Sequence, residues 1–410
     1  MIGAGIFALP ALLYAEVGNF APWMFLVFGL LFAASIVISA RLSTMFESSG
    51  GPQLWSQAAF GPFVGFQVGW VMVIAMAAAR AATFYVLVSY LAVIFPLFGE
   101  VYARVAALAF ILAALTAITM SGMKNSIGGL AVGTLLKLSP IILLCVVVFA
   151  SGGIATTFAL PRFGSFESVA LLVCFAFSGA NSSAFAAGEL RNPRRDLPLT
   201  MLGSLGLIIL FYMAVQWAYI AAGPPQGDGN ATPLAMAAKV VMGDYGALLL
   251  SIAAIFSIAA NALSYFIAGP RVIFGMAERG LLPARFARVY PRFATPDGAI
   301  LLFSAVIALM LASEAFTFFA TMNSLGGQLV VLCYVGAFAV LMRRTTEAHD
   351  GILPLRWWPA MVIAAGFAVF TIVRAPASAF ALLAGLLVIG TGLYFVARRG
   401  KGTAPAPELD

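Results

Sequence analysis

The sequence predicts an all-α, polytopic membrane protein, and three observations lead to that prediction. Of the 410 residues, 63% are hydrophobic and only 9% are charged, and the mean hydropathy is +1.04. The apolar residues gather in stretches of about 20 or more, which is long enough for a helix to cross a bilayer. Lysine and arginine gather in the connections on one side of the predicted helices.

Twelve apolar stretches are expected to span the membrane, and glycine, proline or polar residues separate them. They lie at about 1–15, 22–46, 63–96, 102–121, 127–150, 168–188, 198–222, 246–276, 298–313, 317–342, 357–373 and 376–397. The first stretch begins inside a helix, because no basic flank or cleavage site precedes it. We therefore expect the first helix to be truncated, with about half a helix missing before Met1.

The basic residues predict the orientation of the chain. When the amino terminus is placed in the cytoplasm, most of the 22 Lys and Arg residues fall in cytoplasmic connections. Those on the outer side are Arg104, Arg162, Lys239 and Arg374. The asymmetry indicates a multi-pass protein of the plasma or inner membrane with both termini in the cytoplasm. It also accounts for the net charge of +7, which therefore does not indicate nucleic acid as a partner.

The chain divides into two halves of five spans each, followed by two further helices. The first half covers 1–150, the second 151–345, helices 11 and 12 lie in 346–398, and a cytoplasmic tail covers 399–410. Small residues interrupt the first helix of each half, at Met1–Pro10 and at Phe177–Ser183. Because each half has an odd number of spans, the halves insert in opposite orientations, as an inverted repeat.

The paired interruptions predict a binding site near the middle of the membrane. Irregular backbone at that depth is tolerated only where protein covers it or where it lines a cavity. Corresponding interruptions in two halves therefore indicate a substrate site between the first and sixth helices. The alternative for either stretch alone is that glycine and serine allow close helix packing. Aromatic residues near the interruptions are candidates for a gate, and they are Phe7, Phe175, Phe177 and Tyr265.

The charges within the spans limit the substrate class. All 15 acidic residues map to loops or to the ends of spans. A carrier of arginine, polyamines or metal cations needs a buried carboxylate, because an unpaired charge in a low dielectric is costly. The sequence therefore favours a zwitterionic or anionic substrate.

Two cations lie within spans. Lys137 in the fifth span is expected to exchange a proton during transport or to replace the charge of a sodium ion, and the alternative is a structural cation that binds helix-end carbonyls. Arg80 lies near the middle of the third span and stays charged. It is therefore expected to bind either a substrate carboxylate or backbone carbonyls.

The sequence gives little support to an enzyme or a metal protein. Cys145, Cys174 and Cys333 lie in apolar runs without CxxC spacing, which is typical of buried free thiols. The single histidine, His349, lies in a hydrophilic connection, and no hydrolase or phosphate-loop motif is present. We expect no catalytic residue, no cofactor and no bound metal.

Several motifs, in order along residues 1–345, resemble the amino acid–polyamine–organocation superfamily of transporters. They are Gly3-Ala4-Gly5-Ile6-Phe7 with Pro10, Gly50-Gly51-Pro52, the run from Phe60 to Phe66 with Gly69-Trp70, the run from Phe175 to Gly179 with Glu189 to Pro198, and Arg279 to Pro283. The resemblance implies the leucine-transporter-type fold of five plus five helices. It also implies alternating access to a substrate held between two broken helices.

The resemblance implies roles for individual residues as well. The amides of Gly3, Ala4 and Gly5 are expected to bind the substrate carboxylate, in keeping with the positive end of a helix. Carbonyls near Phe177, Ser178 and Ala180 are expected to bind its amino group. The remaining residues implied to line the pocket are Met76, Arg80, Phe175, Asn181 and Tyr265.

Three further positions bear on coupling and substrate. Lys137 corresponds to the lysine that takes the place of a sodium ion in proton-coupled members of the superfamily. Asn181 stands where many members have glutamate, which disfavours the exchange of cationic substrates. Arg80 stands where a small or polar residue is common.

The leading hypothesis is a secondary active transporter of neutral amino acids that is coupled to protons or acts as an exchanger (antiporter). A carrier of acidic amino acids or other carboxylates is one alternative, because two cations and no anion lie within the spans. A transport-inactive sensor or scaffold is another. The expected partners are an amino acid, a proton and the lipid bilayer; the sequence does not predict the oligomeric state.

Overall fold

The computed structural model describes residues 3–46, 51–122, 127–151, 159–179, 193–224, 231–311, 316–344 and 355–399. Within this part of the chain the side chains of 127–137, 193–194 and 355 are not described. The described residues are helical and form no strand apart from an isolated bridge between Tyr290 and Thr295. The expected all-α class is therefore confirmed.

Fourteen α-helices make up the described structure. They are α1 (Ala4–Val17), α2 (Ala21–Ser43), α3 (Gly51–Phe60), α4 (Pro62–Ile94), α5 (Val101–Met120), α6 (Ile127–Ala150), α7 (Phe163–Ser168), α8 (Ala170–Ala176), α9 (Pro193–Ala222), α10 (Pro233–Glu278), α11 (Asp297–Met310), α12 (Phe316–Met342), α13 (Trp358–Val373) and α14 (Ala377–Arg398). Every apolar stretch expected from the sequence overlaps one of these helices. Seven helical segments of the described chain are long and apolar enough to cross a membrane, and four shorter apolar helices accompany them.

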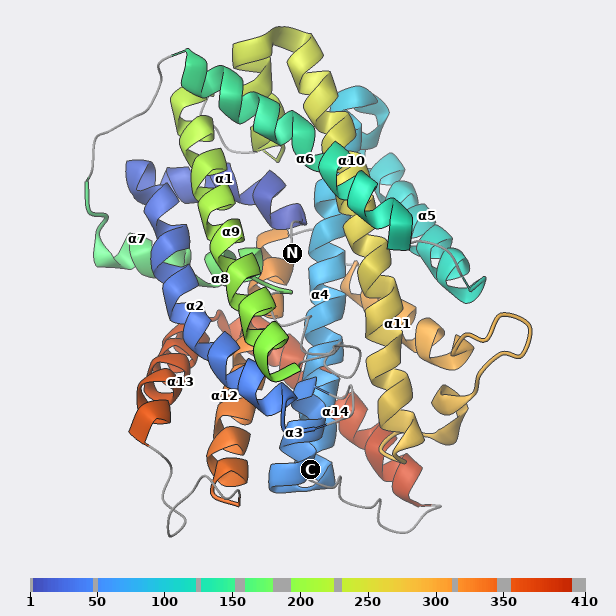
Figure 1. Cartoon of the computed structure of the whole chain (residues 1–410). Helices are drawn as coiled ribbons and strands as arrows, with labels where there is room; N and C mark the ends of the chain where they lie inside the picture. The colour runs from blue at the N-terminus through green and yellow to red at the C-terminus, as the bar shows by residue number, and fades with distance from the viewer. Residues whose placement is uncertain are drawn as a thin grey trace.

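Helix α4 forms the centre of the bundle. It is apolar around its whole circumference, as expected of a helix surrounded by other helices, and 94% of its most apolar window is buried. It packs most extensively against α12 and α10. Figure 1 shows α4 in the middle of the molecule, with the start of α1 beside it.

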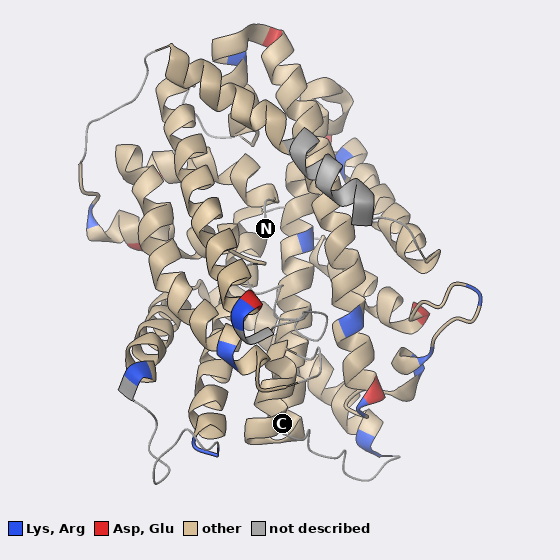
Figure 2. Cartoon of the chain, in the orientation of Figure 1, with Lys and Arg blue, Asp and Glu red and all other residues tan. Residues whose placement is uncertain are grey.

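Charged residues lie mostly at the ends of the bundle and in the connections, as Figure 2 shows. Helix α4 has a single charged residue, Arg80. This distribution agrees with a multi-pass membrane protein, because a charge facing hydrocarbon is costly.

Helix α10 is longer than the stretch expected at 246–276. It begins at Pro233, where proline suits the first turn of a helix, and it contains one non-helical residue, Gly243 (φ 70°, ψ −163°). The added segment carries an exposed ion pair between Lys239 and Asp244 at 3.0 Å. Gly243 forms a kink between two helical segments, and the stretch expected at 246–276 corresponds to the segment that follows the kink.

A glycine on α14 allows that helix to approach α4. The indole Nε1 of Trp70 donates a hydrogen bond to the carbonyl of Leu386 at 2.8 Å. A Cβ atom on Gly390 would overlap the same indole ring, with its Cε2 at 2.6 Å. The close contact between these helices therefore depends on a residue without a side chain.

We expect Gly390→Ala to lower the melting temperature of the purified protein in detergent. The added methyl group must displace the buried Trp70 ring, and overpacking of this kind costs about 1–3 kcal/mol. Gly392→Ala is the matched control, because a Cβ on Gly392 meets no atom within 4 Å. Equal melting temperatures for the two variants would contradict the proposed packing constraint.

Candidate functional site

Helix α1 begins inside the bundle. Gly3 has an extended backbone (φ −138°, ψ −150°), and α1 then runs without a break from Ala4 to Val17. The interruption expected over Met1–Pro10 is therefore confined, in the described residues, to Gly3. The first amides of α1 have no partner within the helix, and the residues that carry them are buried.

Side chains of neighbouring helices bind backbone carbonyls near Pro10. A proline has no backbone donor, so the carbonyl four residues earlier, that of Ile6, has no helical partner. The Tyr90 hydroxyl donates to the Phe7 carbonyl at 2.9 Å, and Gln216 Nε2 donates to the Pro10 carbonyl at 3.0 Å. Side chains of α4 and α9 thus add hydrogen bonds to two carbonyls near the proline.

Helix α8 ends where the second interruption was expected. The helix stops at Ala176, and the Ser178 amide donates to the Phe175 carbonyl at 3.1 Å. Gly179 then adopts a left-handed conformation (φ 99°), which glycine tolerates best. Ala180 and Asn181, which were also expected in the site, lie outside the described residues.

The start of α1 and the end of α8 lie against each other. A Cβ on Gly5 would lie 3.3 Å from the Cα of Ala176 and 3.7 Å from the Phe175 ring. Glycine at this position therefore allows the two backbones to approach. The positive amino end of one helix and the negative carboxyl end of the other are thus brought into one region.

Arg80 lies beside the start of α1 with a fully buried side chain. Its residue surface is 3% exposed, and its Nη1 donates to Asn261 Oδ1 at 3.0 Å. The guanidinium carbon lies 4.0 Å from the centre of the Tyr265 ring, a distance typical of a cation–π contact. The Asn261 side chain also lies against Gly3, since a Cβ on Gly3 would be only 2.9 Å from Asn261 Oδ1.

The Tyr265 side chain reaches from Arg80 to the end of α8. Its hydroxyl lies so close to Gly179 that a Cβ there would overlap the oxygen, while the ring carbon Cζ would lie 3.7 Å away. Arg80, Asn261 and Tyr265, called the arginine cluster below, thus connect the start of α1 with the end of α8.

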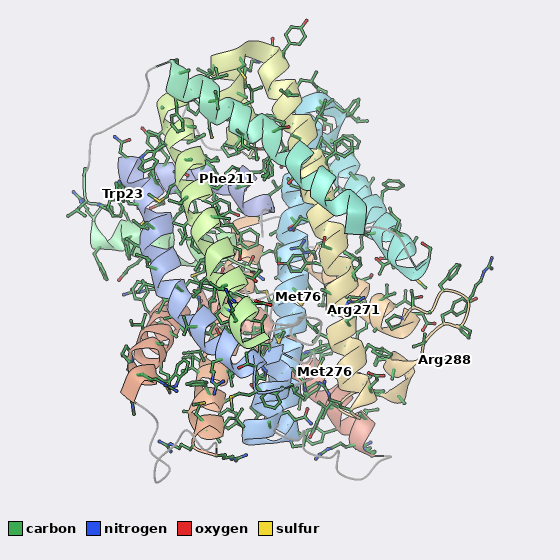
Figure 3. All side chains as sticks on the ribbon, in the orientation of Figure 1. Trp23, Met76, Phe211, Arg271, Met276 and Arg288 are labelled. Carbon is green, nitrogen blue, oxygen red and sulfur yellow. The ribbon has the colours of Figure 1, made fainter. Side chains whose placement is uncertain are left out.

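A cavity of about 580 Å³ extends from this region along α4 and α10. It is lined by Phe32 of α2, Pro52 and Gln53 of α3, Met72, Ala75, Met76 and Ala79 of α4, Cys174 of α8, Ser178 and Gly179, the face of α10 from Ser264 to Gly275 with Arg279, and Asn323 to Tyr334 of α12. Figure 3 labels Met76 on α4 and Arg271 on α10, the helices that flank the cavity. Its volume lies in the range of small-molecule sites.

Polar groups on α12 project into an otherwise largely apolar cavity. Asn323 Nδ2 donates to the Ala75 carbonyl at 2.8 Å, whereas its buried Oδ1 has no hydrogen-bond partner. Gln328 Nε2 donates to Cys174 Sγ at 3.4 Å. The Asn323 oxygen is therefore available to a ligand donor in the cavity.

Arg279 closes the cavity wall at the end near α3. Its Nη1 donates to Gln53 Oε1, and Gln53 Nε2 donates to Gln57 Oε1 at 2.9 Å. Burial lowers the pKa of Arg279 from its ordinary value, and the neighbouring Glu278 carboxylate opposes that shift. Among the described lining residues Arg271 and Arg279 are the charged ones, and both are cations.

The structure brings some of the expected site residues to the cavity and places others behind it. Met76, Ser178 and Tyr265 line the cavity. Gly3 to Gly5 and Arg80 are not among the lining residues. Arg80 lies behind the Tyr265 ring, and Gly3 lies against Asn261. Lys137 belongs to α6, but its side chain lies outside the described part of the chain.

The two phenylalanines at the end of α8 pack within the bundle. The Phe177 ring stacks on Phe32 with 6.0 Å between centroids, and on Tyr212 with 6.4 Å. The Phe175 ring meets Phe316 edge-on at 5.7 Å. Their packing holds the end of α8 in place, and the gate role expected from the sequence stays a prediction.

Sequence reasoning missed Asn261, Asn323 and Gln328. Each is an amide side chain within a long apolar helix, a position where a polar group requires a partner or a function. That signal was present in the sequence. The described residues contain no group of three or more His, Cys, Asp or Glu side chains that could hold a metal ion.

The fold and the cavity define a multi-pass helical membrane protein with an internal cavity of ligand size beside the end of α8. The particular family follows from comparison with known sequences. The chain belongs to the amino acid permease family, which it matches over residues 1–397. This confirms the resemblance noted in the motifs.

Relatives of known name are transporters. An uncharacterised transporter of Mycobacterium tuberculosis is 29% identical over 97% of this chain and 88% of the relative. A serine/threonine exchanger of Bacillus subtilis is 26% identical over 98% of this chain and 94% of the relative. A methylthioribose transporter of the same bacterium is 25% identical, over 97% and 90%. The family consists of transporters rather than enzymes, and this chain is accordingly not an enzyme.

We expect Gly179→Ala to lower the melting temperature, because the left-handed backbone strains a residue with a Cβ by about 1–2 kcal/mol and the methyl group overlaps the Tyr265 oxygen. Adding Tyr265→Phe to Gly179→Ala removes that oxygen, so the double variant should regain part of the lost melting temperature. Gly275→Ala, also in the cavity wall, meets no atom within 4 Å and serves as the control. A double variant no more stable than Gly179→Ala would contradict the contact.

Proposed function

We propose that the chain is a secondary active transporter of amino acids that works by alternating access. The observation that carries this proposal is the meeting of the α1 amino end and the α8 carboxyl end beside a cavity. An amino acid presents a carboxylate and an ammonium group, which complement the amides of Gly3 to Gly5 and the carbonyls near Phe177 and Ser178. Membership of the amino acid permease family supports the same substrate class.

Neutral amino acids are the proposed principal substrates. The cavity wall is mostly apolar, and its described residues include no carboxylate that would offset a cationic side chain. The hydroxyl of Ser178 and the amides of α12 supply hydrogen bonds for small polar substrates. The name of the serine/threonine exchanger, a relative over nearly the whole chain, is consistent with this substrate range.

The proposed transport cycle uses the two ends of the bundle in turn. The cavity extends toward Gln53 and Arg279, at the end where the distribution of basic residues places the cytoplasm. On the opposite side, Arg374 and Glu167 form an ion pair at 2.6 Å between the end of α13 and α7. We propose that this arrangement is inward-facing, and that the inverted halves 1–150 and 151–345 move relative to each other to open the other side.

Uptake of radiolabelled serine, threonine and alanine into proteoliposomes tests the function. We expect saturable uptake that is increased either by an inward proton gradient or by unlabelled amino acid inside the vesicles, because the first indicates proton symport and the second exchange. Protein-free liposomes are the control. Binding without uptake would favour a sensor, and the absence of both binding and uptake would overturn the proposal.

Lys137→Ala tests the proposed coupling role of the lysine. If Lys137 exchanges the coupled proton, this variant should lose the stimulation of uptake by a pH gradient while retaining binding of the amino acid. Lys239→Ala, which removes an exposed lysine on α10, is the matched control. A Lys137→Ala protein with the full response to pH would exclude the coupling role.

A further inference from the structure

Arg80 is a buried cation for which the described structure offers no counter-ion. Its residue surface is 3% exposed, and its Nε, a hydrogen-bond donor, has no partner. Its described contacts are the neutral Asn261 amide and the Tyr265 ring. Because an uncompensated charge in a protein interior is costly, a buried arginine with a free donor indicates that an anion binds there in another step of the cycle.

The start of α1 adds a second positive feature in the same region. The Asn261 oxygen that accepts from Arg80 also lies against Gly3, at 2.9 Å from the place that a Cβ on Gly3 would take. The free amides of the helix start and the guanidinium are therefore neighbours, separated by one amide side chain. A substrate with one carboxylate can occupy the helix start and leave the Arg80 donor unpaired.

Tyr265 lies between Arg80 and the cavity. One face of the ring covers the guanidinium, and the same residue forms part of the cavity wall together with Met76 and Ala79 of α4. A rotation of this single side chain would therefore open Arg80 to a ligand in the cavity. Further along, Arg271 and Arg279 give the cavity a positive potential that attracts anions.

We propose that Arg80 is a specificity-determining residue that binds a second carboxylate, so that acidic amino acids are substrates in addition to neutral ones. The α-carboxylate occupies the start of α1, and the side-chain carboxylate accepts hydrogen bonds from the Arg80 guanidinium. The inference rests on the proposed function, because it assigns a side-chain subsite to the same amino acid site. It extends that function from neutral substrates to a class with net negative charge.

Inhibition of labelled serine uptake by two matched pairs of amino acids tests the inference. Glutamate and glutamine have nearly the same shape and differ in charge, and so do aspartate and asparagine. We expect at least one acidic member to inhibit with an affinity about tenfold or more above that of its amide, as a charge-assisted hydrogen bond provides. In Arg80→Gln the ratio between the affinities for acid and amide should fall to about one, whatever the effect of the variant on the rate of serine uptake.

Arg104→Gln is the matched control. Arg104 lies at the surface of α5, where its Nη2 donates to the Gly99 carbonyl at 3.2 Å, and it does not line the cavity. The acidic preference should be unchanged in this variant. If the wild-type protein transports serine but prefers both amides over their acids, the inference is overturned and the proposed function stands. If it transports no amino acid, the proposed function itself is overturned.

Ligand-induced thermal stabilisation of the wild-type protein provides a test that does not depend on the Arg80 variant being folded. Acidic ligands should raise the melting temperature more than their amides at equal concentration, and the difference should fall as the salt concentration rises. Equal stabilisation by acid and amide would overturn the inference. If a folded Arg80→Gln protein kept the full preference for acidic ligands, the inference would also be overturned, because the arginine would then have only a structural role.

Discussion

Backbone polar groups inside the bundle must find partners, and this constraint governs the arrangement of the central helices. In hydrocarbon an unpaired amide or carbonyl is costly, so an interrupted helix is stable only where protein surrounds it. The bundle meets that requirement around α1 with Tyr90 and Gln216, which bond to carbonyls near Pro10. The first amides of α1 and the end of α8 lie in one region, where we propose that the substrate supplies partners.

The buried position of α4 links this local arrangement to the whole fold. Because α4 contacts α10 and α12 along its length, residues on one of its faces contribute to both the cavity and the arginine cluster. Met76 and Ala79 line the cavity, while Arg80 points behind Tyr265. Two glycines allow close approach elsewhere in the bundle: Gly5 lets α8 approach α1, and Gly390 lets α14 approach α4 at Trp70.

In the proposed function, the positive charges along the site allow one scaffold to accept more than one substrate class. If the helix ends bind the groups that all amino acids share, selection among amino acids depends on the side-chain subsite. Within the described residues that subsite contains amides, apolar side chains and the guanidinium behind Tyr265. The described lining residues include no carboxylate that would compensate a cationic substrate, which is why we propose neutral and acidic substrates.

Patterns along the chain were enough to predict the helical membrane class and the approximate positions of the apolar helices, because hydropathy and charge placement act locally. They also predicted an interruption over Phe177–Ser183, and α8 ends just before it at Ala176. The family resemblance also indicated Arg80, Met76 and Tyr265 as neighbours of a site. The continuation of α1 through Pro10 and the link that Asn261 makes between Arg80 and Gly3 became visible only in the folded bundle, because these features depend on partners far away in the sequence. Asn261 is 181 residues from Arg80, and no local pattern specifies a hydrogen bond between helices at that separation.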